Sequence, residues 1–369
     1  MTGVTQVAVN PLKQAIQFGQ SIWYDGLVPP KTFREMIVRD GLRGATTNPT
    51  IFEKAIASGE YDAKLRDWFS DHRDEEIYEK IAVKAVQQVA DEFRPLYNEI
   101  GGGDGYVSIE VSPFLAYETE ATIREAMKLW LLTARPNVMI KIPATAQGIP
   151  AIEQVISEGI NVNVTLIFSV NRYREVMNAY LSGLEKRVAA GKPVNTIASV
   201  ASFFVSRVDS AVDKVLDEKG GFSSLKGQIA IANSRHAYAE FEKIFSSERF
   251  TKLRAKGAKI QRPLWASTGT KNPAYSDVLY VEQLMGPDTV DTIPPATMDA
   301  FRDHGKPASR LKNNMPKAME ALSELARAGI NLEKVTEDLE KQGVELFNDS
   351  YRKILKSIGD KRNASKSKK

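Results

Sequence analysis

VMIKIPATAQGIPAIEQVISEGINVNVTLIF, residues 138–168, holds the pattern that decides the fold. Two β-type segments, VMIKIP (138–143) and NVNVTLIF (161–168), flank a longer stretch with the apolar spacing of a helix. Strands that alternate with helices pair in parallel, because a parallel pair needs a long crossover connection. This stretch therefore predicts one β–α–β unit.

The same alternation runs through most of the chain. Six further segments have the composition of strands: QSIWYD (20–25), RGATTN (43–48), YVSIEV (106–111), TIASVASFF (196–204), RPLWAS (262–267) and TVDTI (289–293). Helical patterns lie between them, among them residues 75–93, 118–134 and 170–190. Eight such units close naturally into a (β/α)8 TIM barrel of the α/β class.

A doubly wound open sheet is the alternative fold. Its nucleotide-binding form carries a glycine fingerprint after the first strand, and no such fingerprint follows residues 20–25. GGGDG (101–105) precedes a strand, so we interpret it as a loop and not as a phosphate cradle. These two observations favour the barrel.

Strand signals stop after residue 305. Residues 312–330 and 332–358 have the periodicity of amphipathic helices, and we expect these helices to pack on the outside of the barrel. We predict a single barrel domain over residues 1–369, with C-terminal helices in 306–358. The Lys- and Ser-rich residues 359–369 are typical of a disordered tail.

Composition excludes several classes of protein. The chain of 369 residues has no cysteine, which excludes disulfides and thiolate metal sites. No apolar run is long enough to span a membrane, and the start, MTGVTQVAVNPLK, lacks an export pattern, so a cytoplasmic enzyme is expected. The terminal lysines have no interleaved aromatic residues, which argues against nucleic-acid binding. The three histidines form no paired ligand motif, so we expect neither a metal nor another cofactor.

Strand parity points to a site inside the barrel. Side chains alternate faces along a strand, so the aliphatic face Val138, Ile140 and Ile142 should pack on the helices and Lys141 should point inward. The same division puts Val162, Val164 and Leu166 outside. The residues expected on inward faces are Trp23, Asp25, Thr46, Asn48, Ser108, Glu110, Asn161, Asn163, Thr165, Ser202 and Phe204.

This inward set is unusual, because barrel interiors are normally filled by bulky aliphatic residues. Its members lie near the C-terminal ends of strands, where barrel enzymes keep their active sites. A neutral Lys141 amine could attack a ketone and form a Schiff base, whose iminium acts as an electron sink for carbon–carbon cleavage. Glu110 and Asp25 could donate and accept protons, while amide and hydroxyl groups could hold a polyol.

Five motifs at these strands resemble the transaldolase family. They are GATTNPTIFEKAI, VSIEVSP, VMIKIPATAQGIPAI, NVNVTLIFS and ASFFVSRVDS, in the family's order, within a match from about Asp25 to about Thr297. IKIPAT followed by NVTLIF is a specific pairing, whereas TTNP alone would be weak. The long C-terminal part is similar to the longer transaldolase subgroup. The resemblance implies transfer of dihydroxyacetone from sedoheptulose 7-phosphate to glyceraldehyde 3-phosphate, giving erythrose 4-phosphate and fructose 6-phosphate.

The resemblance also assigns roles to residues. Lys141 matches the Schiff-base lysine, Asp25 the acid/base aspartate, and Glu110 with Thr165 the pair that positions a water. The residues matching the substrate-binding positions are Asn48, Asn163 and Ser202 for the dihydroxyacetone portion, Phe204 beside it, and Arg207 for phosphate. Many members carry ASFRN at the seventh strand, whereas this chain has WASTGTKNP. Ser267 carries over there, and Lys271 is the candidate replacement for the missing arginine.

Structural explanations stand beside these roles. Asp25 and Glu110 could merely neutralise Lys141. Asn48 could form a turn before Pro49, Ser202 could be a packing residue, and Lys271 could be a loop charge. Arg207 could pair on the surface with Asp209 or Asp213. His236 and His304 are interpreted as incidental.

Two other functions compete with transfer. A fructose-6-phosphate aldolase would use the same lysine and release free dihydroxyacetone, and in such enzymes the resemblance places a Tyr at the position of Phe204. A catalytically dead barrel that senses sugar phosphates should have lost Lys141, Asp25 or Glu110, and all three are present. The sequence leaves a homodimer open.

Overall fold

The computed structural model describes residues 10–366 as a closed barrel. Eight parallel strands follow one another around it in chain order, which confirms the predicted (β/α)8 fold. The strands are β1 (Gln20–Asp25), β2 (Gly44–Thr46), β3 (Tyr106–Glu110), β4 (Val138–Pro143), β5 (Val162–Ile167), β6 (Ser199–Phe204), β7 (Gln261–Ala266) and β8 (Thr289–Ile293). Residues 1–9, which belong to the start that was examined for an export pattern, lie outside the described residues.

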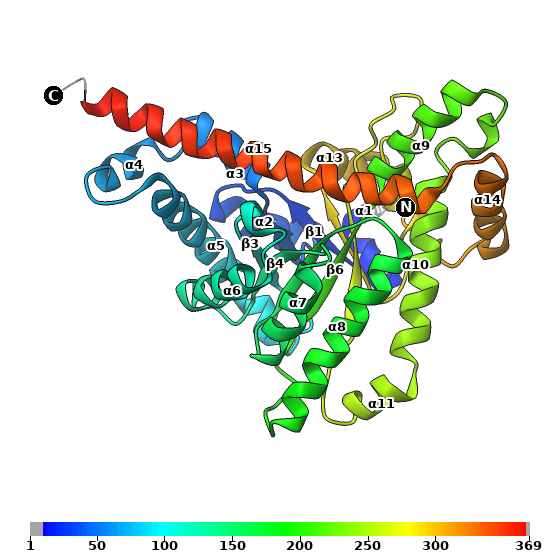
Figure 1. Cartoon of the computed structure of the whole chain (residues 1–369), viewed down its shortest axis with the longest axis horizontal. Helices are drawn as coiled ribbons and strands as arrows, with labels where there is room; N and C mark the ends of the chain where they lie inside the picture. Colours follow the sequence, from blue (N-terminus) through cyan, green and yellow to red (C-terminus); the bar gives the residue numbers. More distant parts are fainter. Residues whose placement is uncertain (1–9, 367–369) are drawn as a thin grey trace, which may run out of the picture.

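Helices between the strands surround the barrel (Figure 1). They are α2 (Pro30–Asp40), α3 (Pro49–Ala57), α4 (Asp62–Trp68), α5 (Asp74–Glu99), α6 (Thr119–Thr133), α7 (Gly148–Ser157), α8 (Val170–Ala189), α9 (Ser206–Lys219), α10 (Ile229–Phe245), α11 (Glu248–Arg254) and α12 (Leu279–Gln283). The short α1 (Pro11–Gln14) precedes β1, and α13 (Pro295–His304) follows β8. Val138, Ile140 and Ile142 of β4, which were expected to pack on the helices, are completely buried.

The N-terminal end of the barrel is filled by large and charged side chains. Trp23 is completely buried and its indole nitrogen donates to Asp104, 2.8 Å away. Arg262 reaches the same carboxylate at 3.3 Å and donates to the Ser21 hydroxyl. Gly44 makes room for this packing, because a Cβ there would lie 2.6 Å from the Trp23 ring. A ligand site is therefore left to the opposite end, where the strands finish.

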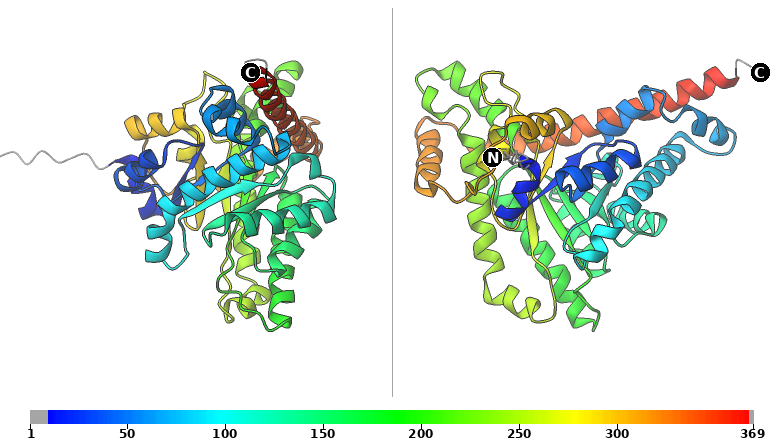
Figure 2. Two further views of the ribbon diagram at one scale, coloured as in Figure 1. Left: turned by 90° about the vertical axis from the view of Figure 1, so that its left-hand side faces the viewer. Right: turned by 180° about the vertical axis from the view of Figure 1, so that it is seen from behind.

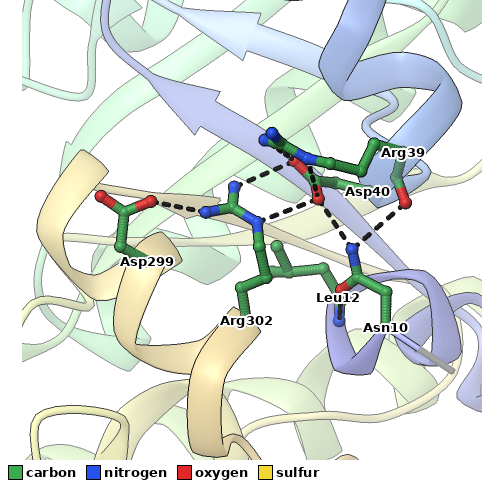
Figure 3. A network of polar contacts seen from close by, with 6 residues as sticks. All are labelled: Asn10, Leu12, Arg39, Asp40, Asp299 and Arg302. Atoms are coloured by element: carbon green, nitrogen blue, oxygen red, sulfur yellow. Dashed lines mark hydrogen bonds and ion pairs between the residues drawn. The ribbon is translucent and has the colours of Figure 1, made fainter. Parts of the chain in front are cut away.

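A polar network ties the start of the described chain to the last barrel helix (Figure 3). Asp40 at the end of α2 is 1% exposed and accepts hydrogen bonds from Asn10, Arg39 and Arg302. These donors hold the pKa of Asp40 down at about 2, against the opposing effect of burial. Arg302 also pairs with Asp299 on α13, so the network joins α2 and α13.

The two C-terminal helices occupy different places. Helix α14 (Met315–Arg327) packs against α10 on the side of the barrel, as expected. Helix α15 (Leu332–Lys366) packs on the barrel at a different place: it runs across one end, against α3, α5, α9 and β5 (Figures 1 and 2). The sequence pattern did not specify that α15 would cover the end of the barrel. The period of an apolar helix face does not say which surface of the molecule that face covers.

Helix α15 is also longer than the sequence pattern suggested. Residues 359–366 were expected to be disordered, but they continue the helix. Arg362 explains this extension, because it donates to the carbonyl oxygens of Phe69 and His72 and pairs with Asp74 at 2.6 Å. Lys361 pairs with Asp62 at 2.6 Å. The last residues of the expected tail, 367–369, lie outside the described residues.

The alternation of β5 breaks at one residue. Leu166 has a left-handed φ of 58°, and the register with β6 shifts between Val164 and Ile167. The sequence predicted that Leu166 would pack on the helices with Val162 and Val164, and this prediction was wrong. Its side chain meets α15 at Gly343, where a Cβ would lie 2.9 Å from a Leu166 methyl carbon.

Candidate active site

Lys141 is held inside the barrel by Glu110 on β3 and by the loop that follows β2. Its side chain is 6% exposed, and Nζ lies 3.2 Å from Glu110 Oε2. The amine also donates to the carbonyl oxygen of Thr47 at 3.1 Å. In the strand register Glu110 is level with Lys141, and Lys141 is level with Asn163. Three adjacent strands therefore place one polar row across the barrel, as strand parity predicted.

Two carboxyl groups face this lysine. Burial raises the pKa of Glu110, and the Lys141 charge opposes that shift. Burial likewise raises the pKa of Asp25, against the charge of Lys141 and a hydrogen bond from the Thr46 hydroxyl at 3.1 Å. A raised pKa makes a carboxyl group more able to hold a proton near neutral pH, which general acid–base work requires.

An ordered chain of hydrogen bonds lies beside the lysine. The Ser202 hydroxyl donates to Asn163 Oδ1 at 2.7 Å, and Asn163 Nδ2 donates to the Ser108 hydroxyl at 2.9 Å. This chain fixes which way the amide points. Ser202 is thus a member of a polar network and more than a packing residue.

Two buried oxygens in the site have no hydrogen-bond partner among the described residues: the Thr165 hydroxyl and Glu110 Oε2. Glu110 Oε2 still has its ion pair with Lys141. Buried polar groups are nearly always satisfied, so these oxygens are available to a water or a substrate group.

A cavity of about 320 Å³ opens at the C-terminal end of the strands. Its wall includes nine of the residues to which the resemblance assigned a catalytic or binding role: Asp25, Asn48, Lys141, Thr165, Ser202, Phe204, Arg207, Ser267 and Lys271. Glu110 and Asn163 are not on this wall, but each contacts a residue that is. The structure therefore brings the complete predicted set together at one end of the barrel.

Arg207 gives the cavity a cationic side. Among the described residues it has no acidic partner, because Asp209 accepts from Tyr280 and Asp213 accepts from Tyr275. The surface ion pair considered for Arg207 is therefore wrong. Its guanidinium lies 5.7 Å from the centre of the Phe204 ring, and burial lowers the pKa of Arg207. A half-buried arginine without an anion is a ready binding site for phosphate.

Two loop residues combine structural and binding features. The Asn48 side-chain oxygen Oδ1 caps α3 by accepting from the backbone nitrogen of Ile51 at 3.0 Å, so the proposed turn exists. Asn48 nevertheless lines the cavity, and its amide nitrogen remains for a substrate. Ser267 has a left-handed φ of 57°, and its hydroxyl lies 3.0 Å from that of Ser206. Lys271 is exposed but also reaches the wall.

Several wall residues were not singled out from the sequence, among them Thr292, Lys54 and Phe347. Thr292 shares a 2.6 Å hydrogen bond with Thr46, and the parity of TVDTI could have indicated it. Lys54, one and a half turns into α3, adds a second cation. Phe347 comes from α15, and no local signal places it over the barrel. The two histidines noted earlier are elsewhere: His236 lines a different cavity, and His304 pairs with Asp277 on the surface.

Residues 10–366 contain no cluster of three or more His, Cys, Asp or Glu side chains arranged to hold a metal ion. Over the same span, no helix combines the length and apolarity needed to cross a membrane.

The fold and site define a class of protein: (β/α)8-barrel enzymes with a buried lysine among carboxyl groups at the C-terminal end of the strands. A family model described as Transaldolase/Fructose-6-phosphate aldolase matches residues 22–358, and the chain belongs to this family. A protein named Transaldolase from Trichodesmium erythraeum is 45% identical over 373 residues, covering 96% of this chain and 98% of that protein. Transaldolase 1 of Streptomyces avermitilis is 47% identical over 359 residues, covering 95% of each chain.

Proposed function

We propose that this transaldolase moves a dihydroxyacetone unit through a Schiff base on Lys141. The donor is sedoheptulose 7-phosphate and the acceptor is glyceraldehyde 3-phosphate, and the products are erythrose 4-phosphate and fructose 6-phosphate. The observation that carries the proposal is the buried Lys141 amine, 3.2 Å from Glu110 at the floor of a cavity with a cationic side. A fixed amine between proton-carrying groups is suited to attack a ketone.

The reaction follows from the positions of these groups. The neutral Lys141 amine adds to the donor's C2 carbonyl, and loss of one water leaves an iminium ion. Asp25 takes the proton of the C4 hydroxyl while the C3–C4 bond breaks, and its electrons move into the iminium to give an enamine. The enamine then attacks the acceptor's aldehyde carbon, Asp25 returns the proton, and water releases the product from Lys141.

Glu110 and Thr165 are suited to handle the water. Two oxygens lack hydrogen-bond partners among the described residues: Glu110 Oε2 and the Thr165 hydroxyl. Glu110 is on β3 and Thr165 is on β5, the two strands that flank the strand of Lys141. Glu110 can protonate the departing hydroxyl of the carbinolamine and later remove a proton from the attacking water. Ser202, Asn163 and Asn48 hold the hydroxyl groups of the dihydroxyacetone portion.

The substrate phosphate binds on the cationic side of the cavity. Arg207 is the principal contact, with Ser267, Lys271 and Lys54 around it. A dianionic phosphate neutralises these charges, and among the described residues none of the three cations forms a salt bridge to an acidic side chain. Lys271 then compensates in part for the arginine that family members carry at the seventh strand.

Borohydride trapping tests this proposal. Reduction in the presence of fructose 6-phosphate should add the three-carbon unit to the peptide that contains Lys141, and Lys141→Ala should be inactive. Labelling of a different lysine in the native enzyme would refute the assignment. Lys54→Ala is the matched control, because Lys54 lies on the same cavity wall but should keep the label on Lys141.

The aldolase alternative differs in the fate of the enamine. Phe204 carries no hydroxyl, so it cannot protonate the enamine or activate water there. This favours transfer over release of free dihydroxyacetone.

We further propose that the chain acts as one barrel domain in the cytoplasm, without a metal or organic cofactor, and that it forms a homodimer.

A further inference from the structure

Helix α15 places an aromatic ring over the lysine. The Lys141 Nζ lies 5.6 Å from the centre of the Phe347 ring, and Phe347 is 5% exposed. Phe347 also lines the cavity that contains Lys141, together with its neighbour Leu346. A residue about 200 positions away in the sequence thus contacts the reacting nitrogen.

The position of this ring is set by contacts on both sides of the barrel end. Four residues before Phe347, Gly343 lets α15 approach Leu166, because a Cβ at Gly343 would lie 2.9 Å from the Leu166 side chain. On one side Glu340 of α15 pairs with Arg172 at 3.2 Å. On the other, the Ser350 hydroxyl lies 2.9 Å from that of Thr50 on α3.

The buried face of α15 continues on either side of Phe347. Val344, Tyr351, Ile354 and Ile358 are all at most 6% exposed, at the spacing of one helical stripe. The helix is therefore fixed by packing along its length, and Phe347 does not carry the attachment alone. Removal of its ring should change the site more than the fold.

We propose that Phe347 is a further catalytic residue, whose aromatic face stabilises the positively charged iminium on Lys141. The proposal rests on the Schiff-base function proposed for Lys141. A cation within about 6 Å of a ring centre is attracted by the negative face of the ring, and the attraction is greatest where water is excluded. The neutral carbinolamine that precedes the iminium gains less from the ring, so Phe347 shifts the equilibrium toward the iminium.

Replacement of the ring by another apolar side chain separates the electrostatic effect of the aromatic face from the exclusion of water above Lys141. Phe347→Leu and Phe347→Met keep an apolar side chain above Lys141 but remove the aromatic face. Each should slow borohydride inactivation at low fructose 6-phosphate, and lower kcat, by between about threefold and thirtyfold. Phe347→Tyr should restore both values. Competitive inhibition by inorganic phosphate, which reports on the Arg207 side, should stay unchanged.

Tyr351 provides the matched control, one turn further along the same helix. It is 6% exposed and packs edge-on against Tyr78 and Phe114, without a contact to Lys141. Tyr351→Leu should lower the unfolding temperature at least as much as Phe347→Leu, yet leave the inactivation rate within about twofold of the native value. This difference would show that the Phe347 effect is local to the lysine.

The outcomes divide clearly. Slower inactivation in both apolar variants, with rescue by Tyr and little effect of Tyr351→Leu, supports the proposal. Equal effects of Phe347→Leu and Tyr351→Leu on the inactivation rate, or no recovery of the rate in Phe347→Tyr, would show that Phe347 is only a packing residue. Either result would overturn the proposal. If the label in the native enzyme mapped to another lysine, the Schiff-base function itself would fail. A label at Lys141 with an unaffected Phe347→Leu would reject this inference alone.

Discussion

Lys141 and Glu110 occupy equivalent positions on adjacent strands, and their charged groups meet at 3.2 Å with both side chains at least 94% buried. Such a pair is expensive to bury, so a barrel interior retains it where it serves a purpose that an aliphatic pair could not. Proton exchange between an amine, a carboxyl group and a bound substrate is such a purpose.

Glu110→Gln should lower kcat by about 100-fold, because an amide cannot give or take the proton that Schiff-base formation requires. Steady-state transfer rates over a range of pH would measure the loss. Glu125→Gln is the control: burial also raises the pKa of Glu125, but its carboxylate accepts from the Ser112 backbone and does not contact Lys141. A Glu125 variant as slow as the Glu110 variant would argue against a special role for Glu110.

Phe204→Tyr should raise the release of free dihydroxyacetone from fructose 6-phosphate relative to transfer. A tyrosine hydroxyl at this position of the cavity wall could protonate the enamine and help to activate water. The measurement is the product ratio with and without glyceraldehyde 3-phosphate. Release as fast as transfer in the native enzyme would favour the aldolase alternative.

Arg207→Met should raise KM for glyceraldehyde 3-phosphate by roughly 10- to 100-fold, because one charge-assisted contact to phosphate is lost. The methionine keeps the apolar stem against Phe204. Lys54→Met should act in the same direction with a smaller effect. Arg34→Met serves as the control, since Arg34 is exposed and pairs with Glu92 away from the cavity. An unchanged KM in the Arg207 variant would place the phosphate elsewhere.

Exhaustive chelation and dialysis should leave the transfer rate intact. The proposed reaction needs an amine and proton carriers, and an iminium supplies the electron sink that a metal ion or organic cofactor would otherwise provide. Rates before and after treatment give the comparison. Activity that disappears and returns with a divalent ion would contradict the expectation.

Asp291→Asn should stabilise the protein in alkaline solution. Asp291 is completely buried on β8, accepts one hydrogen bond from the Thr268 hydroxyl at 2.8 Å, and has its pKa raised to about 8 by burial. The native contribution of the protonated carboxyl is fully present below its ordinary pKa of about 4. It decreases as the pH rises and is lost once the pH passes about 8.

The asparagine variant should therefore gain on the native protein in the free energy of unfolding, by up to about 1.4 kcal/mol for each pH unit between about 4 and about 8. Urea unfolding at several pH values would measure the difference. Some pH dependence should persist in the variant, because burial also raises the pKa of Asp209 to about 7. A constant difference between the two proteins at all pH values would show that Asp291 does not ionise on this scale.

The sequence by itself determined the barrel and most of its site. Side chains alternate strictly along a strand, so a single Lys141 among aliphatic neighbours had to face inward once the strand was recognised. The same rule placed Glu110, Asn163 and Ser202, because parallel strands in register bring equivalent positions to one level. Helix–strand alternation then indicated the closed barrel, since consecutive β–α units pack in only a few ways.

Tertiary structure decided what depends on distant parts of the chain. Leu166 does not lie on its expected face because its own left-handed backbone interrupts β5. Strand parity cannot predict such an irregularity. Among residues 10–366, Arg207 was found to have no acidic partner only when Asp209 and Asp213 were seen bonded to tyrosines. Phe347 reached Lys141 because α15 covers the end of the barrel. A helical period records that one face is buried, whereas the surface that buries it is chosen by packing of the whole molecule.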